Sequence, residues 1–507
     1  MITTDSKITT SSSGTPVGRL WFFAVLLGLV FALAISRQSF WIDELYVALA
    51  AQQPTVDGWW REIFALKGSD LQMPLYMLWS WGCGRIVGTT EVALRAVNLF
   101  WILPGMLALL WALARDRSLQ FATLLVAALS PFAWYYLNEA RPYAMQIGTS
   151  LIVFALLFRL ALNQDKPSRE RLWVAGSCVA SVLLAGSSML AMLWLGAYLG
   201  AAMLSAPKDR LRALLKTYWP WWAGTSLLLF LLGLYYLWTL RQGARATTAG
   251  ITDAKNLFFI VYELFGFSGW GPGRLTIRTG GLEAFRPWLP GLAIYSATLL
   301  VVLTAGCRSV TASFSRRTLL WWILAVALVF GFILAVGVAV RFRVLGRHCA
   351  PLLPLVLFVL GSGLAALLKR RDWAGRLAVA AFVGLSLVSC LSLRFSERHA
   401  KDDYRGAAAL GREALARGET VWWNAEKYGG IIYQVPMTEQ PSEPGHAVLL
   451  INPEKGFEHD RPKPDLVLTS KADLFDSNGA LADYLVRSGF QRTTNLTAFT
   501  VWRAGEK

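Results

Sequence analysis

Residues 20–46 read LWFFAVLLGLVFALAISRQSFWIDELY, an uncharged apolar run followed closely by two adjacent carboxylates, Asp43 and Glu44. The run from Leu20 to Ile35 can cross a hydrocarbon layer of about 30 Å with slight tilt and its flanking residues. The two acids then fall at the interface where the chain leaves the bilayer. Carboxylates beside a bilayer lose hydration unless they face a polar cavity, which makes this pair a candidate functional site.

An ordinary helix start explains the same two acids. Asp43 would cap a helix that runs from Glu44 to Ala51, and both carboxylates would lie favourably at its positive N-terminus. The position of the pair leaves both interpretations open.

The composition is that of a membrane protein. Of 507 residues, 55% are hydrophobic and only 16% are charged, which is too little polar surface for a soluble globular fold. The net charge of +17 is carried by short Lys and Arg clusters between apolar runs, a pattern of topology signals rather than of a nucleic-acid-binding face. The five cysteines lack CxxC or Cys/His spacing, so no disulfide framework or zinc site is expected.

Eleven apolar stretches have the length and composition of transmembrane helices, which predicts a polytopic α-helical protein. They lie at 19–36, 91–113, 119–137, 143–160, 172–186, 189–205, 218–240, 288–306, 319–340, 349–368 and 377–393. A further apolar segment, Pro74 to Gly88, has only 15 residues and carries Arg85.

The charge distribution decides how this short segment is assigned. If it lies in the interface, five basic clusters share the side of the N-terminus; if it spans, all five move to the opposite side. The positive-inside rule favours the interfacial position with a cytoplasmic N-terminus. The clusters are Arg115/Arg117, Lys166/Arg169/Arg171, Lys208/Arg210/Arg212/Lys216, Arg308/Arg316/Arg317 and Lys369/Arg370/Arg371/Arg376.

This topology divides the chain into three parts. Residues 1–18 form a disordered cytoplasmic N-terminus, residues 19–394 form the transmembrane domain, and residues 395–507 form a small α/β domain on the outer side. Amphipathic helices, suited to a membrane surface, are predicted in the first outer loop (37–90) at 44–52 and 71–87, and a helix in the third (241–287) at 256–265. In the C-terminal domain we expect helices at 402–416 and 474–487 and strands at 420–424, 431–435, 446–451 and 465–468.

Several short motifs follow one another along the chain. They are Trp41-Ile42-Asp43-Glu44, Gln72-Met73-Pro74-Leu75-Tyr76, Glu91-Val92-Ala93-Leu94-Arg95, Asn138-Glu139-Ala140-Arg141-Pro142-Tyr143 and, much later, Arg347-His348-Cys349-Ala350-Pro351. In order and separation they resemble the membrane core of GT-C glycosyltransferases. The resemblance is closest to the bacterial branch related to protein O-mannosyltransferases and to the aminoarabinose and galacturonic-acid transferases of lipid A. His348 occupies a Tyr position of that family, and Gln72 stands where many relatives have His.

The resemblance implies a GT-C fold and transfer of a sugar from a polyprenyl-phosphate carrier to an acceptor hydroxyl. The reaction would take place on the periplasmic face of a bacterial inner membrane, with inversion at the anomeric carbon. The acceptor would be a lipid, glycan or protein of the cell envelope, and no nucleic-acid partner is expected.

The resemblance also suggests roles for three acidic residues. Asp43 would be the general base, in a position where partial desolvation raises its basicity. Glu44 would orient Asp43 or bind the acceptor, if it is not simply a helix-start residue. Glu139 would contribute to the site, unless it forms a structural pair with Arg141. Metal dependence stays open, with Asp43 and Glu139 as the ligands if a divalent cation takes part.

The leaving group would be a lipid phosphate, and arginine suits its recognition because the planar guanidinium binds phosphate in a bidentate manner and remains charged when buried. Arg141 and Arg347 are the main candidates for this contact. Tyr76 and Tyr143 either pack against sugar or lipid or belong to an interfacial aromatic belt. Gln72 and His348 are further substrate-binding candidates by position. Headgroup anchoring is the simpler explanation for the reserve candidates Arg274, Arg278, Arg341 and Arg343.

A non-enzymatic membrane protein is the competing class, either a transporter or flippase for lipid-linked sugars or an envelope assembly protein. Transporters tend to place ionisable groups in midplane helices and to contain internal repeats, and neither feature is evident here. The charged motifs gather at one interface, which favours group transfer. Phosphoryl transfer from a lipid carrier is a second enzymatic alternative, and it would leave the phosphate in the product.

Overall fold

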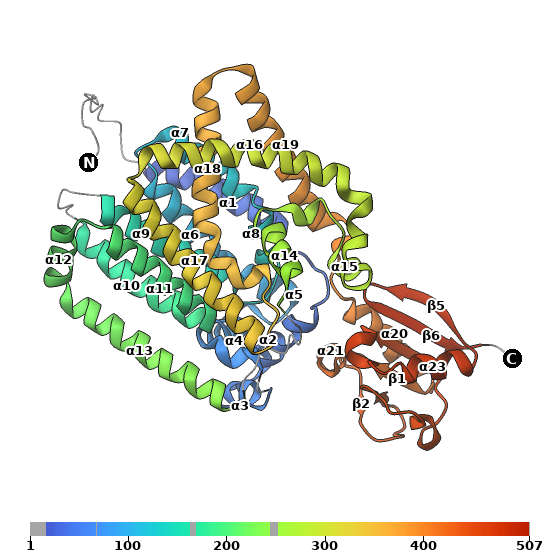
Figure 1. Ribbon diagram of the computed structural model, residues 1–507. Coiled ribbons are helices and arrows are strands. Elements are labelled where there is room, and N and C mark those ends of the chain that lie inside the picture. The colour runs from blue at the N-terminus through green and yellow to red at the C-terminus, as the bar shows by residue number, and fades with distance from the viewer. Residues whose placement is uncertain (1–16, 67, 163–168, 244–251, 506–507) are drawn as a thin grey trace.

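The computed structural model describes residues 17–66, 68–162, 169–243 and 252–505. Most of the predicted disordered N-terminus, Lys166 and part of the loop 241–287 therefore lie outside the described residues. A large helical bundle carries a small C-terminal domain with one sheet, drawn in orange and red at the lower right of Figure 1. The polytopic helical class and the small α/β domain are as predicted from the sequence.

Helices occupy all eleven predicted spans. They are α1 (Val17–Ala34), α5 (Glu91–Ala96) with α6 (Leu99–Ala112), α7 (Arg117–Ala128) with α8 (Pro131–Leu137), α9 (Tyr143–Leu162), α10 (Glu170–Ser187), α11 (Met189–Ser205), α13 (Trp219–Arg241), α16 (Leu289–Ser313), α17 (Arg316–Ala339), α18 (Leu353–Arg370) and α19 (Trp373–Phe395). Among the described residues, seven segments are long and apolar enough to cross a membrane, or eight if the bent pair α7 and α8 is one span. α1 and α11 are apolar but shorter, and α10 is in neither group, so the total of eleven spans stays a prediction.

The breaks between spans follow from capping residues and proline. α7 and α8 meet at an angle of 49°. Ser130 accepts a hydrogen bond from the Ala133 backbone and begins α8, and Pro131, which has no N–H, cannot continue α7. Asp116 and Asp372 cap α7 and α19 in the same way. These three helices therefore start where their own sequence places an oxygen acceptor.

Two ion pairs link four of the five predicted basic clusters, two by two. Asp116, between Arg115 and Arg117, pairs with Lys369 at 2.8 Å, and Glu170, between Arg169 and Arg171, pairs with Arg210. α12 (Lys208–Thr217) and the turn between α18 and α19 lie away from the C-terminal domain in Figure 1. This arrangement agrees with a shared side for the clusters, and which side faces the cytoplasm stays a prediction.

The first outer loop folds into α2 (Ile42–Gln52), α3 (Val56–Leu66), η1 (Ser69–Gln72) and α4 (Pro74–Val87). The predicted helices 44–52 and 71–87 are thus present, whereas α3 was not predicted. α2 does not lie on a membrane surface, because seven of its eleven residues are buried. It packs against α4 and against α21 (Lys427–Ile432) of the C-terminal domain. α4 is not among the candidate spans found in the described part of the chain, as the charge argument predicted.

The third outer loop contributes α14 (Ala254–Leu264), which matches the helix predicted at 256–265. Three short elements follow it before the next span. They are η2 (Phe267–Gly269), α15 (Arg274–Gly280) and η3 (Gly281–Trp288). In Figure 1, α15 lies between the bundle and the C-terminal domain, and η4 (Gly346–Leu352) packs against α14 from the last outer connection.

The C-terminal domain is a six-stranded sheet in the order β2-β3-β1-β4-β6-β5. Strands β1 to β4 run parallel, and β6 and β5 extend the sheet antiparallel. Trp422 and Trp423 on β1 are fully buried in separate hydrophobic clusters, because successive strand residues point to opposite faces. The elements are η5 (Glu397–His399), α20 (Tyr404–Ala416), β1 (Val421–Asn424), β2 (Met437–Thr438), β3 (Ala447–Leu449), η6 (Phe457–Asp460), β4 (Leu466–Ser470), α22 (Ala472–Phe475), α23 (Ala480–Arg487), β5 (Phe490–Leu496) and β6 (Phe499–Ala504).

Parts of this domain differ from the prediction. The segment 431–435, predicted as a strand, forms the end of α21 and a turn, since a short apolar run is compatible with either structure. The helix predicted at 474–487 is divided into α22 and α23 at Gly479, whose φ of 72° is left-handed. β5 was missed because five of its seven residues are exposed and carry no alternating apolar pattern.

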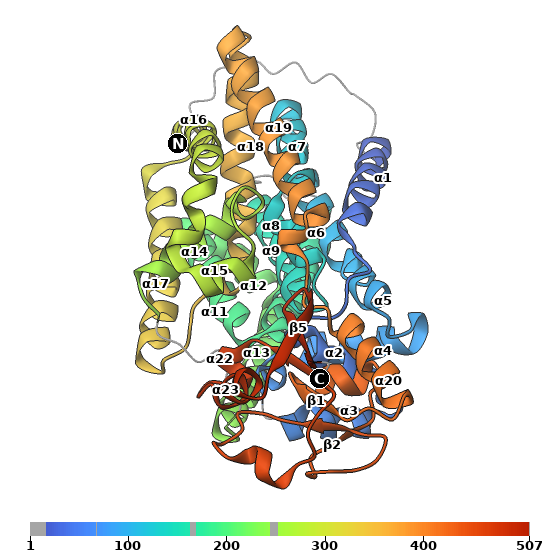
Figure 2. The ribbon, with the colours of Figure 1, turned by 90° about the vertical axis from the view of Figure 1, so that its right-hand side faces the viewer.

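The C-terminal domain docks on the first outer loop. Phe40, Leu45 and Ala48 share one buried cluster with Tyr404 and Trp423. Above this cluster, the Tyr433 hydroxyl accepts hydrogen bonds from the Phe40 backbone and the Ser39 hydroxyl and donates one to Glu91 at 2.7 Å. Figure 2 shows α20 and α2 close together at the junction of the two parts. α2 is therefore held between the bundle and the C-terminal domain.

Candidate active site

The two acids singled out in the sequence lie in the first turn of α2. Trp41 occupies the N-cap, the helix starts at Ile42, and the Glu44 carboxylate accepts a hydrogen bond from the Trp41 backbone at 3.2 Å. The prediction that Asp43 caps the helix is therefore wrong, since that position belongs to Trp41. Adjacent helical residues are rotated by about 100°, so the two carboxylates point into different surroundings.

Glu44 lies in a closed, fully paired environment. Its side chain is 0% exposed and binds Arg95 through two hydrogen bonds of 2.9 and 2.7 Å. Lys401 Nζ lies 3.0 Å from Oε1, which also accepts the Ala140 backbone N–H at 2.7 Å. Burial raises the pKa of Glu44, but the charges of Arg95 and Lys401 outweigh it and lower the pKa to about 2. The carboxylate is therefore a fixed anion without free bonding capacity, which suits a structural role.

Arg95 extends this clamp to the chain before α2. Its guanidinium donates to the carbonyl oxygens of Ser36 at 3.1 Å, Gln38 at 2.6 Å and Ser39 at 3.0 Å. The connection between α1 and α2 is thereby fixed to α5. Arg95 belongs to the Glu91–Arg95 motif, but it was not predicted as a site residue. The sequence did contain a signal for a role of Arg95, because an ionisable residue inside a predicted membrane span is a candidate functional residue.

Asp43 lies in a more open environment. Its side chain is 24% exposed, and Oδ2 lies 2.9 Å from Nη1 of Arg347, which comes 304 residues later in the chain. Burial alone would raise the pKa of Asp43. The positive charges of Arg347 and Arg141 lower the pKa by more than burial raises it, so the pKa of Asp43 lies below its usual value. The expected desolvated base is therefore not present in this state, because two arginines compensate for the burial.

The two predicted phosphate-binding arginines differ in how much bonding capacity they retain. Arg141 donates to the Asp43 carbonyl at 3.1 Å and pairs with Asp70 at 2.7 Å in a buried contact, so it anchors α2 to η1. Asp70 was not predicted as a site residue. In the described part of the chain the Nε of each arginine has no hydrogen-bond partner, but Arg347 donates only to the Asp43 carboxylate, whereas Arg141 has several partners. Of the two, Arg347 is the better placed to accept a phosphate.

Glu139 is the unusual acid of the site. It is 0% exposed, and within the described residues neither carboxylate oxygen has a hydrogen-bond partner. Its nearest cation is Arg274, with Nη1 3.5 Å from Oε1. Burial raises the pKa of Glu139, and the charges of Arg274 and Lys401 only partly oppose this. The structural pair with Arg141 does not form, because Arg141 is engaged by Asp70.

Arg274 contacts residues of the candidate site. Its guanidinium lies over the Tyr135 ring at 4.2 Å and the Trp41 ring at 5.7 Å, and it pairs with Glu263 at 3.2 Å. Glu263 on α14 was not predicted. The other reserve arginines lie elsewhere, since Arg278 pairs with Asp473 of the C-terminal domain and Arg341 and Arg343 are exposed.

The remaining predicted residues have mainly packing environments. His348 Nδ1 accepts the Leu345 backbone N–H at 2.9 Å and its ring packs on Phe342, so it closes the turn before η4. Tyr143 is buried with its ring 4.9 Å from that of Tyr136, and Tyr76 is fully buried. Neither tyrosine belongs to a lipid-facing belt. Gln72 is half-buried at the end of η1.

The donor set does not fit a resident divalent cation. Asp43 is paired with Arg347, and Glu139 lies beside Arg274, so each candidate ligand already has a positive neighbour. Among the described residues, no group of three or more His, Cys, Asp or Glu side chains could hold a metal ion. Positive charge is supplied to the site by arginine and lysine side chains.

Comparison with known proteins gives a structural match only. No family model matches the sequence. The curated proteins likewise contain no match to it. Among solved structures, ArnT from Cupriavidus metallidurans in the apo state has a TM-score of 0.54 and 11% identity, with 97% of this chain and 100% of that chain covered.

A second similar structure is the archaeal oligosaccharyltransferase AglB from Archaeoglobus fulgidus, in complex with an inhibitory peptide and a dolichol-phosphate. It has a TM-score of 0.52 and 9% identity, over 97% of this chain and 75% of that chain. ArnT and AglB are both GT-C glycosyltransferases. This chain therefore has the GT-C fold that the sequence motifs led us to expect.

Proposed function

We propose that the protein is a membrane glycosyltransferase that moves a sugar from a polyprenyl-phosphate donor to an acceptor hydroxyl on the extracytoplasmic face. The contact between Asp43 and Arg347 carries this proposal. It joins a partly exposed carboxylate to an arginine with unused donor capacity, at 2.9 Å, within a GT-C fold. A base and a phosphate-binding group are the two groups that a single displacement from a lipid phosphate needs.

The donor would change the state of Asp43 when it binds. The donor phosphate competes with Asp43 for Arg347, because phosphate oxygens accept the same guanidinium hydrogen bonds. Asp43 then loses its closest positive neighbour and gains a negative one. Both changes raise its pKa, and Asp43 becomes a stronger base only when the donor is in place. This order suits a transferase because an unoccupied site holds no reactive base.

The chemical step follows from this arrangement. The acceptor oxygen attacks the anomeric carbon and passes its proton to Asp43, while the bond from that carbon to the phosphate oxygen breaks. The polyprenyl phosphate leaves with the electron pair, and Arg347 stabilises the developing charge. Attack opposite to the leaving group inverts the anomeric centre. Arg274 supplies a second positive charge nearby, and Glu139, which forms an ion pair with Arg274 but has no hydrogen-bond partner within the described residues, would accept a hydrogen bond from a sugar hydroxyl.

Single-turnover assays with a defined lipid-linked donor test this proposal. Asp43→Asn keeps the shape of the side chain but not its charge, so we expect retained donor affinity and a rate lower by about 10² to 10⁴. Arg347→Ala should weaken donor affinity as well as the rate. Arg278→Ala removes an arginine paired with Asp473 and outside the site, and it is the matched control. A folded Asp43→Asn variant with near-normal turnover would show that Asp43 is not the base.

The donor and acceptor are identified by mass spectrometry of envelope glycans and lipid-linked sugars in cells with and without the protein. A transferase predicts loss of one sugar from the glycan and accumulation of its polyprenyl-linked form. Accumulation on the cytoplasmic face only, without any transfer by the purified protein, would instead identify a flippase.

A further inference from the structure

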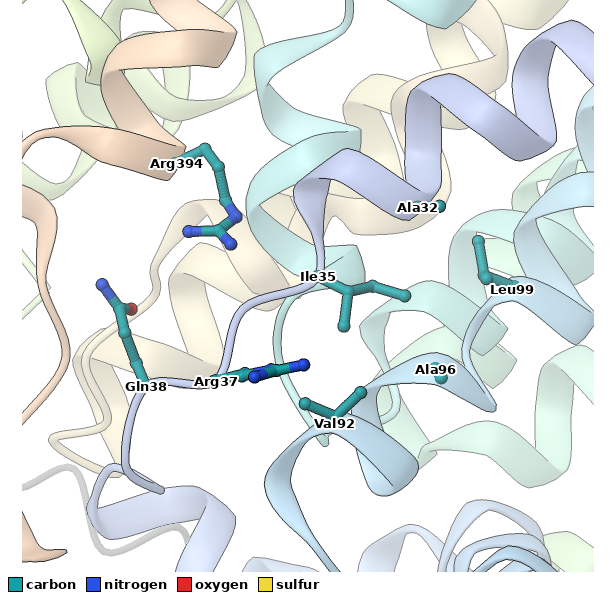
Figure 3. Close-up of a pocket in the computed structure, with 8 residues that line it drawn as sticks. All are labelled: Ala32, Ile35, Arg37, Gln38, Val92, Ala96, Leu99 and Arg394. Carbon is teal, nitrogen blue, oxygen red and sulfur yellow. The ribbon is translucent and has the colours of Figure 1, made fainter.

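A groove of about 710 Å³ lies at the outer end of α1, on a face that neither Asp43 nor Arg347 lines. Its walls are the apolar side chains of Ile35, Val92 and Leu99. Three polar side chains complete it, Arg37, Gln38 and Arg394. Figure 3 shows the Arg394 guanidinium extending from α19 toward Ile35, with Arg37 lying between Ile35 and Val92. The groove therefore combines an apolar wall with two positive groups.

These two arginines have unused donor capacity. In the described part of the chain, the Arg37 side chain forms no hydrogen bond or ion pair, and only its carbonyl is engaged, by Arg405. Arg394 donates through Nε to the Leu33 carbonyl at 2.9 Å, which holds the side chain in place. No Asp or Glu is among the groove-lining residues. The groove thus offers positive charge without a neutralising carboxylate of its own.

The surroundings of the groove are apolar surfaces of the membrane bundle. Large apolar side chains are exposed on each of the three elements that border it, namely Leu29 and Leu33 on α1, Phe100 on α6 and Phe395 on α19. Exposed leucine and phenylalanine on long apolar helices normally face lipid chains. The two guanidinium groups lie at the boundary where these surfaces meet the polar segment 36–40. That depth corresponds to lipid headgroups.

We propose that this groove binds one anionic glycerophospholipid of the surrounding bilayer. Its phosphate would lie between Arg37 and Arg394, where two guanidinium groups can donate hydrogen bonds to its oxygens. One acyl chain would follow Ile35 and Leu99 into the bilayer. The volume of the groove is in the range of small-molecule sites, large enough for a headgroup and the first part of a chain. This lipid site does not depend on the proposed transferase activity.

The bound lipid would also support the segment that leads to α2. Arg37 and Gln38 belong to the stretch whose carbonyls are held by Arg95, and Arg95 binds Glu44 directly. A phosphate on Arg37 therefore fixes this stretch from outside, while Arg95 fixes it from inside. We expect the lipid to stabilise the folded protein as well as to bind it.

The test uses the full-length protein in detergent, with phosphatidylglycerol, phosphatidylcholine of the same acyl chains, and polyprenyl phosphate as probes. Native mass spectrometry and thermal unfolding report binding. We expect phosphatidylglycerol to bind and raise the unfolding temperature, and phosphatidylcholine to do neither. The double variant Arg37→Gln/Arg394→Gln should bind phosphatidylglycerol about tenfold or more weakly, since two charge-assisted contacts are removed.

The matched control is Arg85→Gln/Arg241→Gln, which removes two exposed arginines at helix ends outside the groove and should leave binding unchanged. If the double groove variant fails to fold, phosphatidylglycerol binding is measured with the single variant Arg37→Gln. This substitution should not affect folding, because the Arg37 side chain has no partner within the described residues. Equal phosphatidylglycerol binding by wild type and groove variants overturns the proposal. So does selective loss of polyprenyl phosphate binding, which would make the groove a donor entrance.

Discussion

Two neighbouring carboxylates on one helix lie in opposite environments. Glu44 is fully enclosed, is bound by Arg95, Lys401 and a backbone N–H, and has no free capacity. Asp43, one residue earlier, is partly exposed and faces Arg347, which retains an unpaired Nε. The difference teaches that side-chain direction on a helix, and not the negative charge itself, separates the enclosed acid from the one that faces Arg347.

Neutralising Glu44 should destabilise the folded protein more than any other change to these two acids. Glu44→Gln leaves Arg95 buried beside Lys401 without an anion, and loss of one partner of a buried pair costs about 3–5 kcal/mol. We expect poor yield and early thermal unfolding in detergent. Asp43→Asn should lower the free energy of unfolding by less than Glu44→Gln, since the Asp43 side chain is 24% exposed whereas Glu44 is enclosed. Equal destabilisation by the two variants would contradict the contrast.

A second test uses pH, because Lys401 contacts the enclosed acid. Burial and the charge of Arg95 lower the pKa of Lys401 to about 8. Lys401 is therefore charged below pH 8 and loses its charge as pH rises through that value. We expect turnover to fall above pH 8, since Glu44 and Glu139 lose a positive neighbour. Lys401→Arg should keep its activity at higher pH, because arginine stays charged. If turnover of this variant falls at the same pH as that of the wild type, a group other than Lys401 causes the fall.

A third test follows Asp43 itself. In the free protein the pKa of Asp43 lies below its usual value, because Arg347 and Arg141 outweigh burial. The acid limb of kcat/KM, which reports the free enzyme, should therefore lie below about pH 4. The acid limb of kcat should lie at higher pH, because bound phosphate displaces Arg347. Coincident limbs would mean that Asp43 keeps its arginine in the donor complex.

The smallest effect concerns the contact of the C-terminal domain with the start of α2. Tyr433→Phe removes the hydroxyl that joins Phe40, Ser39 and Glu91. We expect a loss of about 1–2 kcal/mol in unfolding free energy, because buried groups lose their partner. Turnover at low temperature should change little. Tyr428→Phe, whose ring also contacts α2 through Tyr46, serves as a control for loss of a tyrosine hydroxyl at this junction.

Much of the fold could be predicted from apolar run length and charge. The helices at all eleven spans, the exclusion of α4 from the candidate spans of the described residues, and the helix α14 follow from these two signals. Short elements could not be assigned in the same way, as the predicted strand at 431–435 shows, because a five-residue apolar run has no distinguishing period.

The site was predicted in part. Its residues occur within short motifs, but the partners of each acid depend on contacts over long sequence distances, such as the 304 residues between Asp43 and Arg347. The pairing of Arg141 with Asp70 instead of Glu139 is a product of packing that spacing alone does not reveal. The lowered pKa of Asp43 has the same origin, since it requires two arginines from distant segments.

The cluster that joins Phe40 and Leu45 to Tyr404 and Trp423 has a consequence for biogenesis. α2 is among the first segments to leave the ribosome, whereas its upper packing partners are among the last. Contacts between such distant segments form late in folding, because the chain between them must first be ordered. During synthesis, α2 therefore lacks its packing partners from the C-terminal domain until translation ends. We expect the junction between α2 and the C-terminal domain to stay incomplete in every nascent chain until its final strands have paired.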